Sequence, residues 1–162
     1  MQTRRYRVAF VAVVVAALSL ESHFLLAQAK DPLFGHWVLD VSRSTFAAAA
    51  PVKRTMQFMA VPNGIRQTIT TTTGGLANVT YQLVYTAKFD GHEYPADVAS
   101  SLDTVSLKRI DARTVERIGK VKGQVAQTET YAVSPDDHTL TVTQEGQNSG
   151  VPFKSMQIFV RQ

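Results

Sequence analysis

The sequence after residue 30 predicts an all-β domain, an antiparallel up-and-down β-barrel of about 8–10 strands. Apolar and polar residues alternate with period two in one segment after another, which is typical of half-buried strands. Pairs such as Asp90-Gly91 and Lys122-Gly123 separate these segments and favour tight hairpins. No segment between them is long enough for a helix that would bridge parallel strands. A sandwich remains an alternative, but it usually needs a longer crossover, whereas closing a meander removes its edges.

The first half of the domain predicts five strands with turns between them. Residues 42–52 contain four consecutive alanines and predict a short helical turn or loop, which Pro51 ends. Pro62-Asn63-Gly64 and Gly74-Gly75 predict tight turns, because Asn and Gly accept positive φ. The Thr-rich segment before Gly74 suits a strand with one exposed face. The expected strands are residues 34–41, 53–61, 65–72, 76–89 and 92–94.

The second half predicts five more strands joined by hairpin-length loops. The joints contain Asp, Gly or Pro and lie at residues 111–112, 122–123, 135–137 and 146–150. The expected strands are residues 103–110, 114–121, 124–133, 139–144 and 152–161. The sequence contains no internal repeat and no linker between globular parts, so residues 30–162 are expected to form one domain.

Residues 1–29 predict a secretory signal peptide. Three arginines precede an apolar run of 13 residues, and Ala27-Gln28-Ala29 matches a cleavage site. An anchor helix is the alternative, but a spanning helix needs about 20 apolar residues, and Glu21-Ser22-His23 interrupts this run. Arg4-Arg5 leaves the twin-arginine route open beside the general one. We therefore expect an exported, periplasmic or secreted protein with no stable membrane anchor after cleavage.

Composition excludes several classes of protein. The leader holds three of the 17 basic residues and one of the 13 acidic ones, so its removal lowers the net charge from +4 to +2. No cluster of Lys or Arg remains, and we expect no nucleic-acid partner. The chain has no cysteine, which excludes disulfides and cysteine chemistry. The sequence leaves the oligomeric state open.

The segment LFGHWVLDVSRSTF, with Gly35-His36-Trp37 at the predicted start of the first strand, resembles the opening of calycin proteins. In fatty-acid-binding proteins an apolar residue, Gly, any residue and Trp precede a Ser and a Phe, here Ser44 and Phe46. The segments YTAKFDGHEYP and DTVSLKRID are similar to exported bacterial lipocalin-like domains. The resemblance implies a lipocalin-like barrel that binds a small hydrophobic or amphipathic molecule.

The resemblance also implies how one end of the barrel closes. In lipocalins an Arg late in the chain packs across the motif Trp, so we expect Gly35, Trp37 and Arg161 to form a closure, with a cation–π contact of about 1 kcal/mol. Two departures stand out. Residues 42–52 are too few for the two-helix lid of fatty-acid-binding proteins. Gln157 and Phe159 stand where those proteins carry the Arg and Tyr that hold a carboxylate.

The apolar phase of each strand is expected to point into the barrel. Val41, Val79 and Val125 are expected on this inner face, whereas the inner faces of residues 114–121 and 152–161 stay open. Arg109 and Glu129 share this phase, and they either contact a polar ligand group or reach solvent at the rim. The tyrosines fit an amphipathic ligand or core packing equally well. The candidate ligand-binding residues are Met56, Phe58, Tyr81, Leu83, Tyr85, Leu107, Arg109, Gln127, Glu129 and Tyr131.

Little in the sequence favours an enzyme. There is no Gly-x-Ser-x-Gly motif, and His36, His92 and His138 are isolated, so we predict no catalytic residue, cofactor or metal. The main prediction is an exported protein that binds a small ligand inside the barrel. One alternative is a structural or interaction module, such as an inhibitor or envelope component, whose barrel is filled by side chains. Another is an enzyme with a site at the barrel mouth, built from Arg109, Glu129 or a histidine.

Overall fold

Ten antiparallel strands follow one another along the chain in this computed structural model, which describes residues 31–62, 64–97, 101–148 and 150–162. The predicted signal peptide lies outside the described residues, whereas Pro32–Gln162 form one compact unit. No helix within the described residues is long and apolar enough to span a membrane. The strands are β1 (Gly35–Thr45), β2 (Lys53–Val61), β3 (Gly64–Thr73), β4 (Val79–Ala87), β5 (Asp90–Pro95), β6 (Thr104–Arg109), β7 (Thr114–Val121), β8 (Gln124–Val133), β9 (Thr139–Asn148) and β10 (Val151–Arg161).

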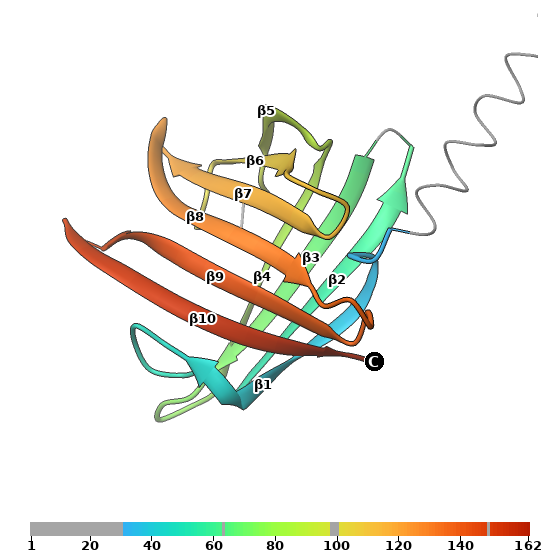
Figure 1. The fold of residues 1–162 in the computed structure, drawn as a ribbon. Coiled ribbons are helices and arrows are strands. Elements are labelled where there is room, and N and C mark those ends of the chain that lie inside the picture. The colour runs from blue at the N-terminus through green and yellow to red at the C-terminus, as the bar shows by residue number, and fades with distance from the viewer. Residues whose placement is uncertain (1–30, 63, 98–100, 149) are drawn as a thin grey trace, which may run out of the picture. The chain divides into compact units, whose positions relative to one another are not determined.

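The strands form one sheet in the order β4-β3-β2-β1-β10-β9-β8-β7-β6-β5. Each strand pairs with the next one in the sequence except β4 with β5, and β1 also pairs with β10, so the sheet curls into a nearly closed barrel (Figure 1). Among the described residues, the edge strand β4 is joined to the segment that follows the other edge strand, β5, by the bridge Tyr85–Ala96 and by the hydrogen bond from Asp97 N to Val84 O, 2.9 Å. The predicted fold class, an all-β up-and-down barrel, is confirmed.

The predicted end of the first strand was wrong. β1 does not end at residue 41 but continues to Thr45 through a bulge, and residues 46–52 then form a loop, which was one of the two alternatives expected for this segment. The Asp40 carboxylate organises the bulge: it accepts hydrogen bonds from the Ser42 amide and hydroxyl and from Arg43. Ser44 Oγ then donates to the Asp40 carbonyl at 2.6 Å and accepts from the Ile158 amide at 2.9 Å, which keeps β1 attached to β10.

The barrel has two different ends. The β1–β2, β3–β4, β5–β6, β7–β8 and β9–β10 connections all lie at one end, here named the open end, which is at the left of Figure 1. The start of β1, the end of β10 and the remaining turns lie at the other, closed end. Side chains with almost no exposed surface fill the closed half; they include Leu33, Trp37, Phe58, Leu140 and Phe159.

Trp37 lies at the floor of the barrel and has no exposed surface. Its Nε1–H donates to the Leu33 carbonyl at 2.9 Å. The guanidinium carbon of Arg161, the cross-strand partner of Trp37, lies 4.1 Å from the indole ring centre. Arg161 also donates to the carbonyls of Pro32, Phe34 and Asp137, each at 2.6 Å. One side chain thereby joins the segment before β1, the end of β10 and the β8–β9 loop.

Gly35 is required here for two reasons. Its φ is +130°, which residues with a side chain rarely adopt. In addition, a Cβ atom at this position would lie 2.6 Å from Arg161 Nη1. The glycine therefore leaves the space in which the guanidinium reaches the backbone.

Three residues expected inside the barrel are exposed instead: Val41 (40%), Val79 (58%) and Val125 (57%). Val41 lies within the bulge of β1, between Asp40 and Thr45, which changes the side to which its side chain points. Val125 pairs with Lys120 on one side of the register shift between β7 and β8, and Ala126, within the shift, packs against the core in its place. Val79 begins the edge strand β4, where no strand covers it. The structure also assigns the inner faces of residues 114–121 and 152–161, which the sequence left open. The side chains that point inward and are buried are Val115 and Arg117 of β7 and Ser155, Gln157 and Phe159 of β10.

We predict that Trp37→Ala lowers the free energy of unfolding by about 3–5 kcal/mol, because a large buried ring is lost and the cavity is only partly refilled. Urea unfolding followed by circular dichroism measures the change. Trp37→Phe, which keeps a ring under Arg161, is the matched control and loses less. An alanine variant as stable as the parent would contradict the structural role of this ring.

Candidate ligand-binding site

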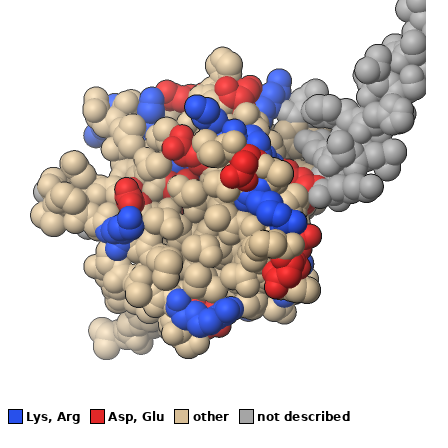
Figure 2. All heavy atoms as spheres, in the orientation of Figure 1, with Lys and Arg blue, Asp and Glu red and all other residues tan. Residues whose placement is uncertain are grey.

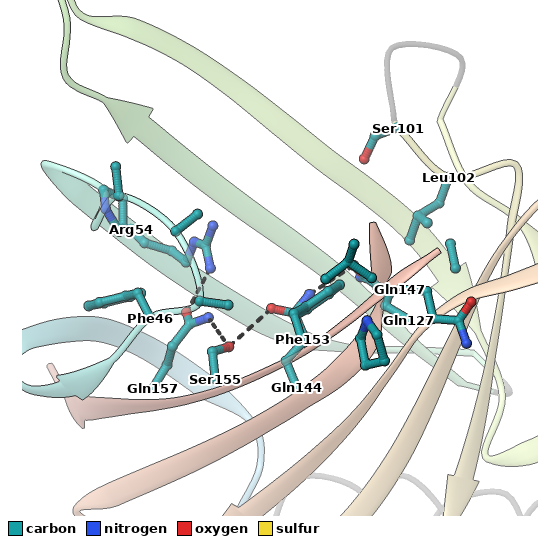
Figure 3. A pocket seen from close by; sticks show the side chains of 17 residues that line it. Phe46, Arg54, Ser101, Leu102, Gln127, Gln144, Gln147, Phe153, Ser155 and Gln157 are labelled. Carbon is teal, nitrogen blue, oxygen red and sulfur yellow. Dashed lines mark hydrogen bonds between the residues drawn. The ribbon is translucent and has the colours of Figure 1, made fainter. Parts of the chain in front are cut away.

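The open half of the barrel contains a cavity with an inner and an outer part. The inner part has a volume of about 550 Å³ and the outer part about 870 Å³. Arg54, Ser101, Gln127 and Gln144 line both parts, so the two are continuous. The outer part lies between the β1–β2 loop and the β9–β10 hairpin, as the close view in Figure 3 shows. The interior is therefore not filled by side chains.

A chain of hydrogen bonds crosses the cavity wall from strand to strand. Arg54 Nε donates to Thr71 Oγ1 at 3.0 Å, and Arg54 Nη1 donates to Gln157 Oε1 at 2.6 Å. Gln157 Nε2 donates to Ser155 Oγ at 3.5 Å, and Ser155 Oγ donates to Gln144 Oε1 at 3.3 Å (Figure 3). These side chains come from β2, β3, β9 and β10, so the chain joins strands that are far apart in the sequence.

The chain continues toward the closed half. Gln144 Nε2 donates to Gln127 Oε1 at 2.8 Å, and Gln127 Nε2 donates to Glu129 Oε1 at 3.4 Å. Tyr131 Oη donates to Glu129 Oε2 at 2.6 Å and accepts from Gln67 Nε2 at 3.3 Å. Tyr85 donates to the Gln67 carbonyl oxygen. We name this set the polar belt; it comprises Arg54, Gln67, Thr71, Tyr85, Arg117, Gln127, Glu129, Tyr131, Gln144, Ser155 and Gln157.

Arg117 is the charged centre of the polar belt. Its side chain is only 1% exposed, and its Nη2 forms an ion pair with Glu129 Oε1 at 2.7 Å. Its guanidinium carbon also lies 6.0 Å from the ring centres of both Tyr85 and Tyr131. Two further nitrogen atoms, Nε and Nη1, are buried without a hydrogen-bond partner among the described residues. A buried N–H group without a partner costs about 1–3 kcal/mol, so these atoms call for an acceptor.

Charge and burial fix the protonation of this centre. Burial is the largest single effect and lowers the pKa of Arg117, but Glu129, Tyr131 and Tyr85 together outweigh it and raise the pKa above its ordinary value. Burial raises the pKa of Tyr85 and that of Tyr131, and Arg117 offsets only part of this. Arg117 is therefore charged, and both tyrosines are protonated donors. Among the described residues that line the inner cavity, Arg54 and Arg117 outnumber the single carboxylate of Glu129.

The structure brings together half of the predicted ligand-binding residues at the cavity. Met56, Tyr81, Leu83, Gln127 and Glu129 line the inner part, although Tyr81 is 50% exposed at the strand end. Tyr85 and Tyr131 belong to the polar belt beneath it. Phe58 and Leu107 are buried in the core. Phe58 packs edge-on against the Tyr131 ring at 5.6 Å.

The structure places Arg109 away from the cavity. Its guanidinium carbon stacks 4.1 Å from the ring centre of Phe89, and the residue is partly exposed at the end of β6. Arg109 lines neither part of the cavity, so the rim interpretation describes it better than a pocket wall. Its position also separates it from Glu129, which pairs with Arg117 instead.

Arg117 was the main residue that sequence reasoning missed. A regular two-residue hairpin at Lys122-Gly123 would pair Arg117 with Thr128, whose side chain is on the outer face of β8. The register shift after Gly119 pairs Arg117 with Glu129 instead, so that its side chain points into the barrel. Arg54, Gln144, Ser155 and Gln157 were also absent from the predicted site, because polar residues on an inner face look like exposed residues until the cavity is known.

No histidine among the described residues lines the two cavity parts. His92 contacts Asp90 at 3.3 Å and is largely exposed. Within the described part of the chain, no three His, Asp or Glu side chains are grouped so that they could hold a metal ion. The charged side chains among the described residues that line the cavity are therefore Arg54, Arg117 and Glu129.

Comparison with known proteins supports the architecture. No protein-family model matches the sequence, and no curated protein matches it significantly. Among solved structures, As-p18, an extracellular fatty acid binding protein, superposes with a TM-score of 0.53 at 14% sequence identity. The match covers 82% of this chain and 97% of that chain. The barrel has the calycin fold. At the level of the fold, the resemblance expected from Gly35-His36-Trp37 is thus confirmed, and this calycin barrel resembles a fatty-acid-binding one.

We predict that Arg117→Met lowers the free energy of unfolding by about 3–5 kcal/mol, because it leaves the Glu129 carboxylate buried without its cation. Arg117→Met combined with Glu129→Gln removes both charges and keeps an acceptor for Tyr131, so most of the lost stability returns. Urea unfolding of the parent, both single variants and the double variant gives the coupling energy. Additive effects would show that the two side chains do not act as a pair.

Proposed function

We propose that this protein binds a small amphipathic molecule inside the barrel, with an oxygen-bearing polar end at the polar belt. The two unpartnered nitrogen atoms of Arg117 carry this proposal. Arg117 is one of the residues that line the inner cavity of about 550 Å³, which is large enough to hold more than a single bridging water. A ligand oxygen that reaches the buried nitrogen atoms from this cavity would accept from a guanidinium that Glu129 already holds in place.

The apolar part of the ligand would lie in the outer cavity. Phe46, Pro51, Leu102 and Phe153 line this part, together with the alanines of the β1–β2 loop. These side chains offer an apolar surface between the polar belt and the open end (Figure 3). A pocket in which apolar side chains adjoin a polar belt suits a molecule with one polar end.

The charge of the inner cavity favours a monoanionic polar end. Glu129 offsets Arg117, and Arg54 is left as an additional cation whose hydrogen bonds go to uncharged Thr71 and Gln157. A carboxylate near Arg54 would balance the cavity. This anchor differs from the one implied by the family resemblance, since Gln157 and Phe159 stand in place of the Arg and Tyr on the last strand.

We further propose that the protein carries this ligand outside the cytoplasm. The signal peptide expected at residues 1–29 supports export, and the related fold of As-p18 belongs to an extracellular fatty acid binding protein. The open cavity also favours binding over the alternative of a scaffold with a filled interior. The ligand site we propose comprises Arg54, Arg117 and Gln144 together with the cavity-lining residues expected from the sequence.

We predict that the purified protein binds a long-chain carboxylate more tightly than the corresponding alcohol. Displacement of anilinonaphthalene sulfonate fluorescence measures both affinities, and mass spectrometry of an organic extract identifies any lipid that the protein retains. In the double variant Arg117→Met, Glu129→Gln, which keeps the charge balance, binding of the carboxylate weakens by roughly tenfold, since a charged hydrogen bond is lost.

Arg109→Met is the matched control, because it removes a cation that stacks on Phe89 outside the cavity. Its binding should equal that of the parent. A parent protein that retains no lipid and displaces no probe would refute the proposed function. Equal weakening in the Arg109 and Arg117 variants would refute the assignment of Arg117.

A further inference from the structure

We infer that the protein forms a symmetric dimer in which residues 79–83 of the edge strand β4, here named the β4 edge, pair with the same residues of a second copy of the chain. The inference rests on the backbone groups that β4 turns away from β3, on the difference between the two edges of the sheet, and on the side-chain pattern of the β4 edge. It concerns the outside of the barrel and does not require the cavity to be occupied.

The β4 edge offers backbone hydrogen-bonding groups to a partner strand. In an antiparallel ladder such as that of β3 and β4, successive residues turn their N–H and C=O groups alternately toward the neighbouring strand and away from it. Val84 O accepts from Asp97 N at 2.9 Å, so Val84 is one of the residues whose groups point away from β3. Thr80 and Gln82 have the same phase, and none of the described strands pairs with them on that side.

The two edge strands differ in the features that prevent pairing with another chain. Edge strands avoid such pairing through charges, proline and irregular pairing, and β5 has all three, with Asp90, Glu93, Pro95 and a register shift between the first two. Figure 2 shows acidic and basic side chains beside one another along the upper part of the molecule, where β5, β6 and β7 lie in Figure 1. In contrast, residues 67–87, which include all of β4, contain no charged residue and no proline. β4 is therefore the edge on which pairing is unopposed.

Exposed apolar side chains gather along the β4 edge. Val79 and Tyr81 are at least half exposed, and Leu76, in the connection before β4, is fully exposed. Single exposed apolar side chains are normal, whereas several in one region mark an interaction site. A strand paired with the β4 edge would cover part of Val79 and Tyr81.

The β4 edge is complementary to itself. Its sequence, Val-Thr-Tyr-Gln-Leu, alternates apolar and polar residues in a pattern that reads the same in both directions. In an antiparallel pair with a two-fold axis at Tyr81, Gln82 exchanges backbone hydrogen bonds with Thr80 of the partner subunit. Val79 then lies opposite Leu83 of the partner subunit, so apolar side chains meet on one face of the sheet and polar side chains meet on the other.

A second copy paired through β4 fits better than the other possible partners. Pairing of β4 with β5 of another copy would build an open-ended chain of molecules, and the charges and Pro95 of β5 oppose it. Pairing of β4 with β4 is closed, because it uses the exposed edge of both molecules at once. A strand of a different protein would find no charged side chain on residues 67–87 that could select it.

The first test uses single cysteines, because the chain contains none. The two copies of residue 81 lie opposite each other in the proposed pair, so Tyr81→Cys should form a disulfide-linked dimer under mild oxidation with copper phenanthroline. Ile110→Cys is the matched control, since Ile110 is 53% exposed and Tyr81 is 50% exposed. It should remain almost entirely monomeric. Non-reducing gel electrophoresis measures the cross-linked fraction of both variants.

A second pair of variants tests the β4 edge without cross-linking. Thr80→Lys places a charge on the β4 edge. Thr86→Lys makes the same change at an exposed position of the same face of β4, beyond the Tyr85–Ala96 bridge. Sedimentation equilibrium should show a concentration-dependent dimer for the parent and for Thr86→Lys, and loss of the dimer for Thr80→Lys, because a charge on an edge strand opposes pairing.

Three results would overturn the inference. The first is a parent protein that stays monomeric at concentrations up to roughly 1 mM. The second is a dimer that Thr80→Lys leaves intact, or cross-linking of Ile110→Cys equal to that of Tyr81→Cys, since either would assign the contact to another surface. The third is a series of larger oligomers, which would mean that β4 pairs with a different strand of the next molecule.

Discussion

The contact between Arg161 and Trp37 holds the barrel closed, and the cavity depends on it. Arg161 is the next-to-last residue of the chain, yet it stacks on the ring from the first strand and binds three backbone carbonyls. This arrangement anchors β10 beside β1, and without that pairing the strands would divide into one sheet of β1 to β4 and another of β5 to β10. The closed half is filled around Trp37, and the cavity described above lies toward the hairpins at the other end.

The polar belt reflects a second constraint, because polar side chains inside a barrel must find their hydrogen-bond partners among themselves. Side chains from β2, β3, β8, β9 and β10 do so in one continuous series of hydrogen bonds, in which the Glu129 carboxylate is the terminal acceptor. Among the described residues of the polar belt, Arg117 is the one with buried donors that have no acceptor. This unused hydrogen-bonding capacity at the charged centre of the network is the feature on which the proposed ligand site rests.

Most of the fold could be predicted from the sequence, because alternation and turn residues are local signals. The bounds of β2, β7 and β8 match the expected ranges, and Trp37 lies at the closed end of the barrel, as expected. The errors cluster at two irregularities of the sheet, the bulge after Asp40 and the register shift after Gly119. Each depends on pairing between strands, which no local pattern contains, and each reverses the side to which nearby residues point. That reversal concealed Val41, Val125 and, above all, Arg117.

The incomplete pairing of β4 with β5 gives the barrel a seam. Elsewhere each pair of neighbouring strands is joined by at least four residue pairs, but in the part of the chain that the structure describes one bridge and one amide hydrogen bond join this edge. Backbone hydrogen bonds contribute about 1 kcal/mol each, so fewer of them must break here than at the paired strands. The barrel can therefore widen along one defined line while Trp37, Arg161 and the β1–β10 pairing stay in place, which makes its girth adjustable on one side only.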